Sequence, residues 1–545
     1  MELRVASLTL RLGTGTRPAV LAVPVAPTGD DTDDSAAGPG SAGKAGSAGS
    51  AGKAGSAGSA GKAGSAGSAG KAGSAGSAGK AGSAGGAAAA VLATVPLPAG
   101  TESVLAAYLA DVEHSGAAGS IEVLPRPGER PQRLIAVGVG DGTEADWRAA
   151  GAAVVRAAAK QPALTVAVPD GLTDAQLAGL AEGILLAGYR FSLAADDSGA
   201  PALNRVTIAA DAARYGPALA HAQAVAEATA LARDWVNTPS NDKSPEWFAG
   251  RIARAAEKHQ VQVRIRDAAA LAAEGFGGVV AVGEGSPRPP RLVELRWRPR
   301  GAQRHVVLVG KGITYDTGGI DIKPIGAMEL MRKDMGGAGA VAAATIGAAA
   351  MRLPVRVTAL LPLADNVVSG AAYRPGDVVR HYGGITTEIQ NTDAEGRIVV
   401  ADALAYAVRR LAPDVLVDLA TLTGAQRVAL GKKTAALYAT DDELAAALAA
   451  AGDDAGEPMW RMPLPADYVE KVHSSTVADL NNAPVQGEAG SVMGALFLRE
   501  FTAGHPCWAH VDMSAPAWSA SAAGELPKGA TGWGVRTLLR YLATQ

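Results

Sequence analysis

The chain has 545 residues, of which 48% are hydrophobic but only 4% aromatic, and its formal net charge is −3. This length allows two to four domains of about 150 residues each. The charge gives no overall attraction to nucleic acid. Because Cys507 is the single cysteine, an intrachain disulfide is excluded, which fits a reducing compartment.

Neither the start of the chain nor its longest small-residue run predicts membrane targeting. Residues 1–4 lead into alternating apolar residues rather than into a basic segment followed by a long apolar one. The uncharged run 336–351 is too short and too rich in small residues to span a bilayer, which needs about 20 apolar residues. We therefore expect a soluble, cytoplasmic protein.

The first part of the chain alternates short strand-like and helix-like segments around a low-complexity tract. The tract, at about residues 37–86, repeats Gly-Lys-Ala-Gly-Ser-Ala-Gly-Ser-Ala and has no large apolar residue, so we expect a flexible insert. We predict a small N-terminal α/β domain over residues 1–215 whose role is assembly or regulation. Its expected strands are 3–12, 19–25, 133–139, 164–168 and 206–209, and its expected helices are 146–160 and 174–188.

A helix-like run at 216–236 then connects to a larger domain, predicted over residues 237–545. Ser244 and Pro245 are typical of a helix start, as N-cap and first helical residue. Strand–helix alternation predicts a catalytic α/β domain with a mostly parallel central sheet. Its expected strands are 305–309, 355–363 and 415–420, and its expected helices are 337–351 and 398–411.

Polar residues cluster where these strands end, at 311–316, 323–334 and 391–397. In parallel sheets, sites gather just past the carboxyl ends of strands. Four acids brought together without cations would repel one another, whereas two divalent ions about 3.5–4 Å apart remove that problem. Oxygen-rich ligand sets without His or Cys suit hard or borderline metals. The acids are Asp316, Asp334, Asp393 and Glu395.

Residue types alone leave several roles open. Each acid taken singly is typical of a solvated loop, and Lys311 is either an ordinary exposed lysine or, if neutral, a metal ligand. Lys323 and Arg397 would be fixed positive charges that stabilise a developing oxyanion or hold an anion. The number and setting of these groups favour a two-metal hydrolase.

These segments resemble the leucyl aminopeptidases, a family of two-metal hexameric exopeptidases. The resemblance covers most of residues 225–540, and Asn-Thr-Asp-Ala-Glu-Gly-Arg at 391–397 is its most specific part. The tract at 37–86 belongs to no family pattern, and the N-terminal half diverges. The matching segments are 309–320, 322–324, 331–337, 391–397, 418–425, 508–512 and 529–532.

The resemblance implies a homohexamer with two divalent ions per subunit, Mn or Zn first and Mg or Co as alternatives. One ion would be held by Asp316, Asp393 and Glu395. The other would be held by Lys311, Asp316, Asp334 and Glu395. Asp316 and Glu395 would thus bridge the two ions.

The resemblance also implies an activity, the release of Leu or other apolar N-terminal residues from peptides. Water activated by the two metals would attack the scissile carbonyl, with Lys323 steadying the oxyanion and Arg397 holding a bicarbonate that moves the proton. The free amine of the substrate would bind one metal and Asp334. Residues matching the family's substrate-binding positions are Met331, Asp334, Thr421, Leu422 and Gly424.

A second class of function stays open, because some bacterial relatives bind DNA as architectural or regulatory hexamers. The acidic balance of the chain disfavours it, since affinity for phosphates needs clustered Lys and Arg. A relative with a dead site is disfavoured because each matched ligand position carries the required residue type. His381, the histidine nearest to the motif, is expected to be structural.

Overall fold

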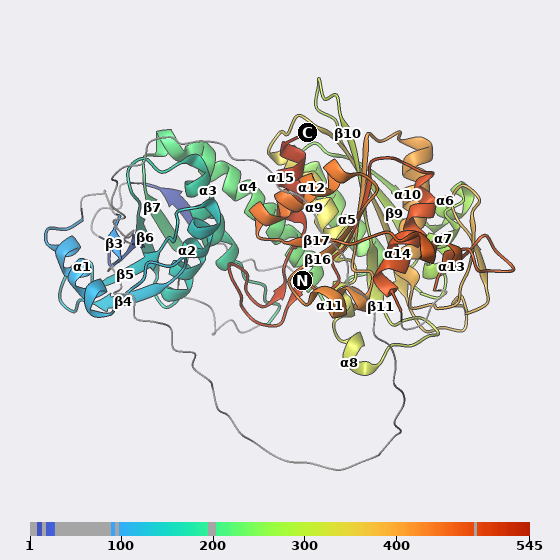
Figure 1. Ribbon diagram of the computed structural model, residues 1–545, viewed down its shortest axis with the longest axis horizontal. Coiled ribbons are helices and arrows are strands. Elements are labelled where there is room, and N and C mark those ends of the chain that lie inside the picture. The colour runs from blue at the N-terminus through green and yellow to red at the C-terminus, as the bar shows by residue number, and fades with distance from the viewer. Residues whose placement is uncertain (1–7, 14–17, 28–88, 93–96, 195–202, 484–487) are drawn as a thin grey trace, which may run out of the picture. The chain divides into compact units, whose positions relative to one another are not determined.

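The computed structural model describes residues 8–13, 18–27, 89–92, 97–194, 203–483 and 488–545. The predicted flexible tract at 37–86 lies outside the described residues. Within the described residues, the main elements form a seven-stranded and a nine-stranded sheet with their covering helices (Figure 1). No helix of this part of the chain is long and apolar enough to cross a membrane.

The seven-stranded sheet is built from the first part of the chain. In the described residues its order is β1-β7-β6-β2-β5-β4, with β3 beside β2, and only the β2/β3 and β4/β5 pairs are antiparallel. The strands are β1 Thr9–Leu12, β2 Val20–Ala26, β3 Ala90–Val91, β4 Ile121–Pro125, β5 Arg133–Gly138, β6 Ala163–Ala167 and β7 Arg205–Ala209.

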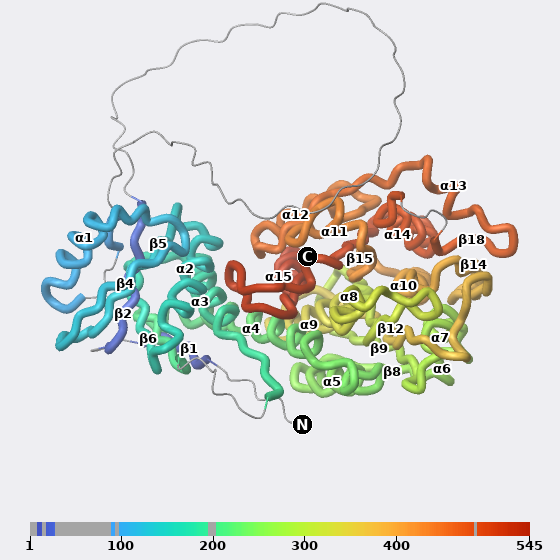
Figure 2. The backbone as a smooth tube through the Cα atoms, turned by 90° about the horizontal axis from the view of Figure 1, so that it is seen from below, coloured from blue at the N-terminus to red at the C-terminus, as the bar shows by residue number. Residues whose placement is uncertain are grey.

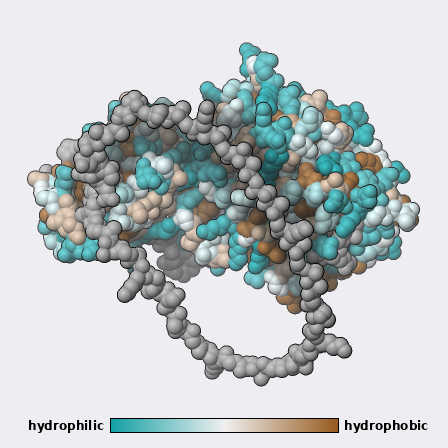
Figure 3. Space-filling model, viewed as in Figure 1, coloured by the Kyte–Doolittle hydropathy of each residue, from teal (hydrophilic) through white to brown (hydrophobic). Residues whose placement is uncertain are grey.

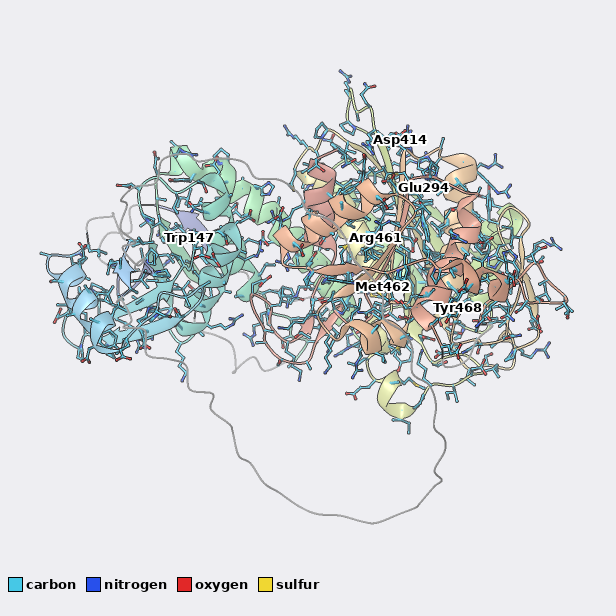
Figure 4. The ribbon with its side chains drawn as sticks, viewed as in Figure 1. Trp147, Glu294, Asp414, Arg461, Met462 and Tyr468 are labelled. Atoms are coloured by element: carbon cyan, nitrogen blue, oxygen red, sulfur yellow. The ribbon has the colours of Figure 1, made fainter. Side chains whose placement is uncertain are left out.

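Helices α1 Thr101–Asp111, α2 Glu144–Ala157 and α3 Asp174–Ala187 accompany this sheet. Both α2 and α3 begin with a capping box, in which the side chains of a threonine and the residue three positions later bond each other's backbone. Trp147 of α2 lies in the apolar core of this region (Figure 4).

Two capped helices lead into the larger sheet. Helix α4, Ala212–Asn237, starts where the Asp211 carboxylate accepts a hydrogen bond from the backbone of Ala213. Helix α5, Pro245–Glu257, begins as predicted, because the Ser244 hydroxyl accepts from the Trp247 amide at 3.1 Å. Figure 2 shows α5 beside strands β8 and β9 of the larger sheet.

The nine-stranded sheet has the order β17-β16-β19-β15-β10-β12-β9-β8 in the described residues, with β11 also paired to β12. Strands β19, β15, β10, β12 and β11 run parallel, whereas β8, β9 and β16 join antiparallel. The strands are β8 Gln262–Arg266, β9 Arg291–Trp297, β10 His305–Gly310, β11 Gly312–Asp316, β12 Arg356–Asn366, β15 Val415–Ala420, β16 Ala435–Ala439, β17 Met459–Arg461 and β19 Trp508–Asp512.

Helices cover both faces of this sheet, as the side chains of its central strand β10 show. Val306 and Leu308 belong to the core that contains α9, Gly336–Ala350. Val307 and Val309 belong to the core that contains α10, Glu395–Arg410. Successive residues of a strand point to opposite faces, so a continuous apolar run indicates burial on both sides. The predicted fold class, two α/β regions with mostly parallel sheets, is confirmed.

Remaining short elements connect these layers. Helices α6 Ala268–Glu274 and α7 Gly277–Gly283 precede β9, and α11 Gly424–Leu430 and α12 Asp442–Ala455 flank β16. A small sheet contains β13 Val378–Arg380, β14 Thr386–Glu388 and β18 Leu480–Asn481. Other helices are α8 Ile325–Met328, the 3-10 turn η1 Met331–Lys333, α13 Val469–Val472, α14 Gly490–Arg499 and α15 Val535–Ala543.

We predict that replacing Gly337 by alanine destabilises the protein, because α9 begins in direct contact with the sheet. A Cβ at Gly337 would lie 2.1 Å from the carbonyl oxygen of Leu419 and 3.1 Å from the backbone nitrogen of Lys311. Gly337→Ala should lower the free energy of unfolding by about 1–3 kcal/mol, measured by urea unfolding followed by circular dichroism.

Gly250→Ala is the matched control, since its added methyl would meet only the end of the Arg254 side chain, at 3.8 Å, within helix α5. That variant should be as stable as the parent, or more stable by about 0.5–1 kcal/mol. Identical unfolding curves for both variants would contradict the proposed close contact.

Candidate functional site

Four acids and a lysine from separate segments meet beyond the carboxyl ends of the parallel strands. Lys311 lies between β10 and β11, and Asp316 is the last residue of β11. Asp334 lies between η1 and α9, Asp393 lies in the loop before α10, and Glu395 opens α10. Asp316, Asp393 and Glu395 offer carboxylate oxygens that all lie within 4.8 Å of one another.

Two lysines bridge these acids in pairs. The Lys311 Nζ lies 2.7 Å from Asp334 Oδ2 and 2.7 Å from Glu395 Oε1. The Lys323 Nζ lies 2.7 Å from Asp316 Oδ2 and also contacts Asp393 Oδ1. Each ammonium thus neutralises part of a buried anionic cluster.

One carboxylate oxygen of the cluster has neither a hydrogen bond nor an ion pair in the described residues. It is the buried Oε2 of Glu395, because Asp334 Oδ2, Asp393 Oδ1 and Glu395 Oε1 each contact a lysine ammonium. A buried anionic oxygen without such a bond costs free energy unless a cation compensates it. This set of oxygen donors, with one amine beside it, fits hard or borderline divalent ions.

The ionisation of the acids shows how crowded the site is. Burial and the neighbouring carboxylates raise the pKa of Asp316 and of Asp393 to about 7. Burial opposes ionisation of Glu395, but Lys311 and Lys323 outweigh it and lower its pKa. Burial likewise opposes the charge on Lys311, yet the adjacent carboxylates raise its pKa above the ordinary value. The protonation of these groups is therefore set by burial and by the neighbouring charges rather than by contact with solvent.

Close packing and backbone donors hold Asp316 and Lys311 in place. Asp316 Oδ1 accepts hydrogen bonds from the Gly318 amide and the Asn366 side chain, both at 2.8 Å, which leaves Oδ2 toward Lys323. A Cβ at Gly396 would lie 2.6 Å from the Lys311 Nζ. The glycine inside the acidic motif is therefore required for Lys311 to reach Glu395.

A cavity of about 260 Å³ opens beside this cluster. All the predicted site residues except Arg397 line it: Lys311, Asp316, Lys323, Met331, Asp334, Asp393, Glu395, Thr421, Leu422 and Gly424. Sequence reasoning did not single out the other lining residues, which include Leu330, Lys333, Thr423, Arg427, Ser514 and Ala515.

An apolar surface lies beside the cavity, at α8, which contributes Gly326 and Ala327 to the lining. Ile320 is 43% exposed, Ile322 is 62% exposed and Ile325 is 90% exposed. Figure 3 shows hydrophobic surface, in brown, over α8 at the lower edge of the view.

Arg397 is buried outside the cavity lining and is held by a residue that sequence reasoning missed. Its Nη1 donates to the Asn482 carbonyl oxygen at 2.6 Å, while its Nε has no hydrogen-bond partner in the described residues. Burial lowers the pKa of Arg397 to about 10, against the opposing effect of Glu395. The Asn482 side chain also bonds the backbone of Gln390 and Asn391, at 2.7–3.2 Å. Asn482 therefore ties Arg397 to the acidic loop.

Asp512 plays a similar part for the predicted substrate-binding loop. Its carboxylate accepts from the backbone of Leu422 and of Thr423, both at 3.1 Å, and from the Thr423 hydroxyl at 2.6 Å. Thr421 donates to Asp334 Oδ1 at 2.7 Å. Asp512 lies in a segment that resembles the family, but only the fold reveals its partners.

His381 lies apart from the acidic cluster, in a hydrogen-bond chain. Its Nδ1 is 3.0 Å from Asp402 Oδ1, and its Nε2 is 3.0 Å from the Thr387 hydroxyl. Asp402 also accepts from the backbone amides of Val279 and Tyr382, both at 2.9 Å. The expected structural role of His381 agrees with this packing.

The chain is similar to the models of one protein family and to several of its members. Residues 230–539 match the family model described as "Cytosol aminopeptidase family, catalytic domain", and residues 69–194 match that family's N-terminal domain. A "probable cytosol aminopeptidase" of Streptomyces avermitilis is 44% identical over 465 residues, which cover 81% of this chain and 89% of the relative. One of Mycobacterium tuberculosis is 41% identical over 462 residues, covering 82% and 89%.

Solved structures show the same likeness. The bottromycin maturation enzyme BotP in complex with Mn is 40% identical with a TM-score of 0.74, covering 80% of this chain and 96% of that one. A mutant of tomato leucine aminopeptidase is 32% identical with a TM-score of 0.72, covering 81% and 87%. With its clustered acids Asp316, Asp393 and Glu395 and the matching catalytic domain over 230–539, the chain belongs to the cytosol aminopeptidase family.

Proposed function

We propose that this metal-dependent aminopeptidase uses two divalent ions to release Leu and other apolar N-terminal residues from peptides. The observation that carries the proposal is the convergence of four acids, three buried and one half-buried, and Lys311 on one cavity, where Glu395 Oε2 has no partner in the described residues. The manganese named for the BotP structure supports Mn as one of the ions, with Zn, Mg and Co as alternatives.

The two ions would share the ligands that the resemblance implied. Asp316, Asp393 and Glu395, which lie within reach of one another, would hold the first ion. Lys311, Asp316, Asp334 and Glu395 would hold the second, and Lys311 would then be neutral, because a nearby dication favours the free amine. When bound, such ions activate water and polarise a carbonyl.

The chain's own residues would orient the substrate. Asp334 would accept a hydrogen bond from the substrate's free amine, which restricts cleavage to N-termini. The Leu422 carbonyl would accept from the substrate amide, and the loop that carries it is fixed by Asp512. Met331, Thr421 and Gly424, which line the cavity, would contact the first side chain.

Two fixed cations would assist proton and charge movement. Lys323, held between Asp316 and Asp393, would stabilise the oxyanion of the tetrahedral intermediate. The guanidinium of Arg397, whose Nε has no partner in the described residues, would hold a bicarbonate that carries the proton to the leaving amine. We also infer a cytoplasmic location, supported by the cytosolic naming of the family and of the relatives, and a homohexamer, which the resemblance implies.

The first test compares substrates with free and blocked amines. Leucyl p-nitroanilide should be hydrolysed, N-acetyl-leucyl p-nitroanilide should not, and exhaustive chelation should remove activity that Mn²⁺ or Zn²⁺ restores. Release of p-nitroaniline measures all three. Hydrolysis of the acetylated compound, or activity that survives chelation, would contradict the proposed function.

The second test separates metal binding from catalysis. Asp393→Asn should reduce the metal content below two ions per subunit, measured by elemental analysis of purified protein. Lys323→Met should keep both ions but lower kcat by about 100- to 1,000-fold, as loss of one group that stabilises an oxyanion does. If Lys323→Met leaves kcat unchanged, or if Asp393→Asn retains both ions, the assigned roles are wrong.

The third test uses the pH dependence of stability without metal. Asp316 and Asp393 have a pKa of about 7 when folded, against an ordinary value of 3.8. The folded, metal-free protein therefore binds more protons than the unfolded chain between about pH 4 and pH 7, so its stability should fall as pH rises through that window. Metal should remove this loss, because it binds the ionised carboxylates.

Calorimetric Tm values of chelated and Mn-loaded protein would measure the effect. The difference in Tm should widen from about pH 5 to pH 7, and chelated Asp393→Asn should show a shallower decline than the chelated parent. If the Tm of the chelated protein stays level or rises across this range, the pKa values of Asp316 and Asp393 are not raised by crowding of the carboxylates.

A further inference from the structure

One wall of the cavity carries a cation where the family resemblance predicted an apolar pocket. Lys333 and Arg427 line the same cavity as Met331, Thr421 and Gly424. Lys333 belongs to the 3-10 turn η1, between the expected pocket residue Met331 and the acid Asp334. This position places a charged side chain at the site expected to receive the first residue of the substrate.

The partners of Lys333 differ from those of the other two lysines in the cavity. Lys311 and Lys323 each bridge two carboxylates. In the described part of the chain, Lys333 forms no ion pair, and its Nζ donates one hydrogen bond, to the Ser514 carbonyl oxygen. An ammonium has three donor hydrogens, so two remain for another acceptor.

The anchor of Lys333 is itself fixed. Ser514 donates from its hydroxyl to Asp512 Oδ1 at 2.9 Å and from its backbone amide to the same oxygen at 3.2 Å. The same Asp512 carboxylate also accepts hydrogen bonds from the backbone amides of Leu422 and Thr423. The Lys333 ammonium is thus held at a defined place by the framework that positions the substrate-binding loop.

Asp334 and Asp512 lie near enough to favour the charge on Lys333, but neither forms an ion pair with it in the described residues. Leu330, Met331 and Ala515 contribute apolar lining, and the four acids of the cavity belong to the proposed metal centre. A partly buried cation is stabilised by an anion that enters with the substrate, and charge-assisted hydrogen bonds are about twice as strong as neutral ones.

We propose that Lys333 binds the side-chain carboxylate of an acidic first residue, so that the enzyme releases N-terminal glutamate or aspartate as well as apolar residues. This inference rests on the proposed function, because the first side chain reaches Lys333 only if the metal centre holds the substrate amine. Lys333 is then a specificity-determining residue, which contacts the substrate without taking part in bond cleavage.

The test compares glutamyl, glutaminyl and leucyl p-nitroanilides on the metal-loaded enzyme. Glu and Gln have nearly the same shape, so the ratio of their kcat/KM values isolates the charge. The unmodified enzyme should favour Glu over Gln, and raising the salt concentration should reduce that preference. An enzyme that hydrolyses the leucyl compound but treats Glu no better than Gln would overturn the proposal without any variant.

Lys333→Met then tests the residue itself. The Glu-to-Gln ratio should fall by about 10- to 100-fold, the range that one hydrogen bond to a charged group supports, and kcat/KM for the glutamyl compound should fall more than kcat/KM for the leucyl compound. Arg427→Met, which removes the exposed cation of the same cavity, is the matched control and should change the ratio much less.

Three outcomes would refute the assignment to Lys333. An equal loss of kcat/KM on all three substrates would show that Lys333 supports the position of Ser514 and does not contact the substrate. An unchanged ratio in Lys333→Met, or a larger change in Arg427→Met, would place the selectivity elsewhere. Absence of leucyl hydrolysis by the unmodified, metal-loaded enzyme would instead contradict the proposed function, so the two failures are distinguishable.

Discussion

Repulsion among three buried carboxylates and one half-buried carboxylate is the constraint on which this structure depends. Asp316, Asp334, Asp393 and Glu395 lie at one cavity, and burial together with their neighbours raises the pKa of three of them. Lys311 and Lys323 offset part of this charge, yet the buried Oε2 of Glu395 has no partner in the described residues. A fold retains such a cluster at a cost in stability, which divalent cations recover on binding. Function and stability are therefore linked through the same groups.

The parallel sheet supplies the precision that this cluster needs. Strands β10 and β15 end side by side and β11 continues from β10 along β12, so Lys311 and Asp316 emerge at the same end of the sheet as Thr421, which is distant in the chain. Helix α9 begins so close to this edge that the Ala338 amide donates to the Lys311 carbonyl oxygen at 2.8 Å. Small residues at the start of α9 allow this approach, and Asp334, just before it, is thereby aimed at the Lys311 ammonium.

Features with a local signal were predictable from the sequence, whereas those made by distant pairing were not. The Ser244 cap and the apolar run of β10 were predicted because capping chemistry and burial act on neighbouring residues. The antiparallel strands β8 and β9 were missed. The direction of a strand in a sheet is set by the strands that it pairs with, not by its own composition. Asn482 was missed for the same reason: an asparagine in a loop reveals nothing until Gln390 and Asn391 lie beside it.

Three lysines of one cavity show why residue type alone does not assign a role. Lys311 and Lys323 each lie between two acids, so their charge is consumed within the protein. Lys333 is bonded to a neutral carbonyl oxygen, so its charge is available to whatever enters the cavity. The resemblance assigns a role to Met331 but none to Lys333, although both lie in the matching segment 331–337. Selectivity for the first residue therefore has to be derived from the partners of each side chain, which only the folded chain supplies.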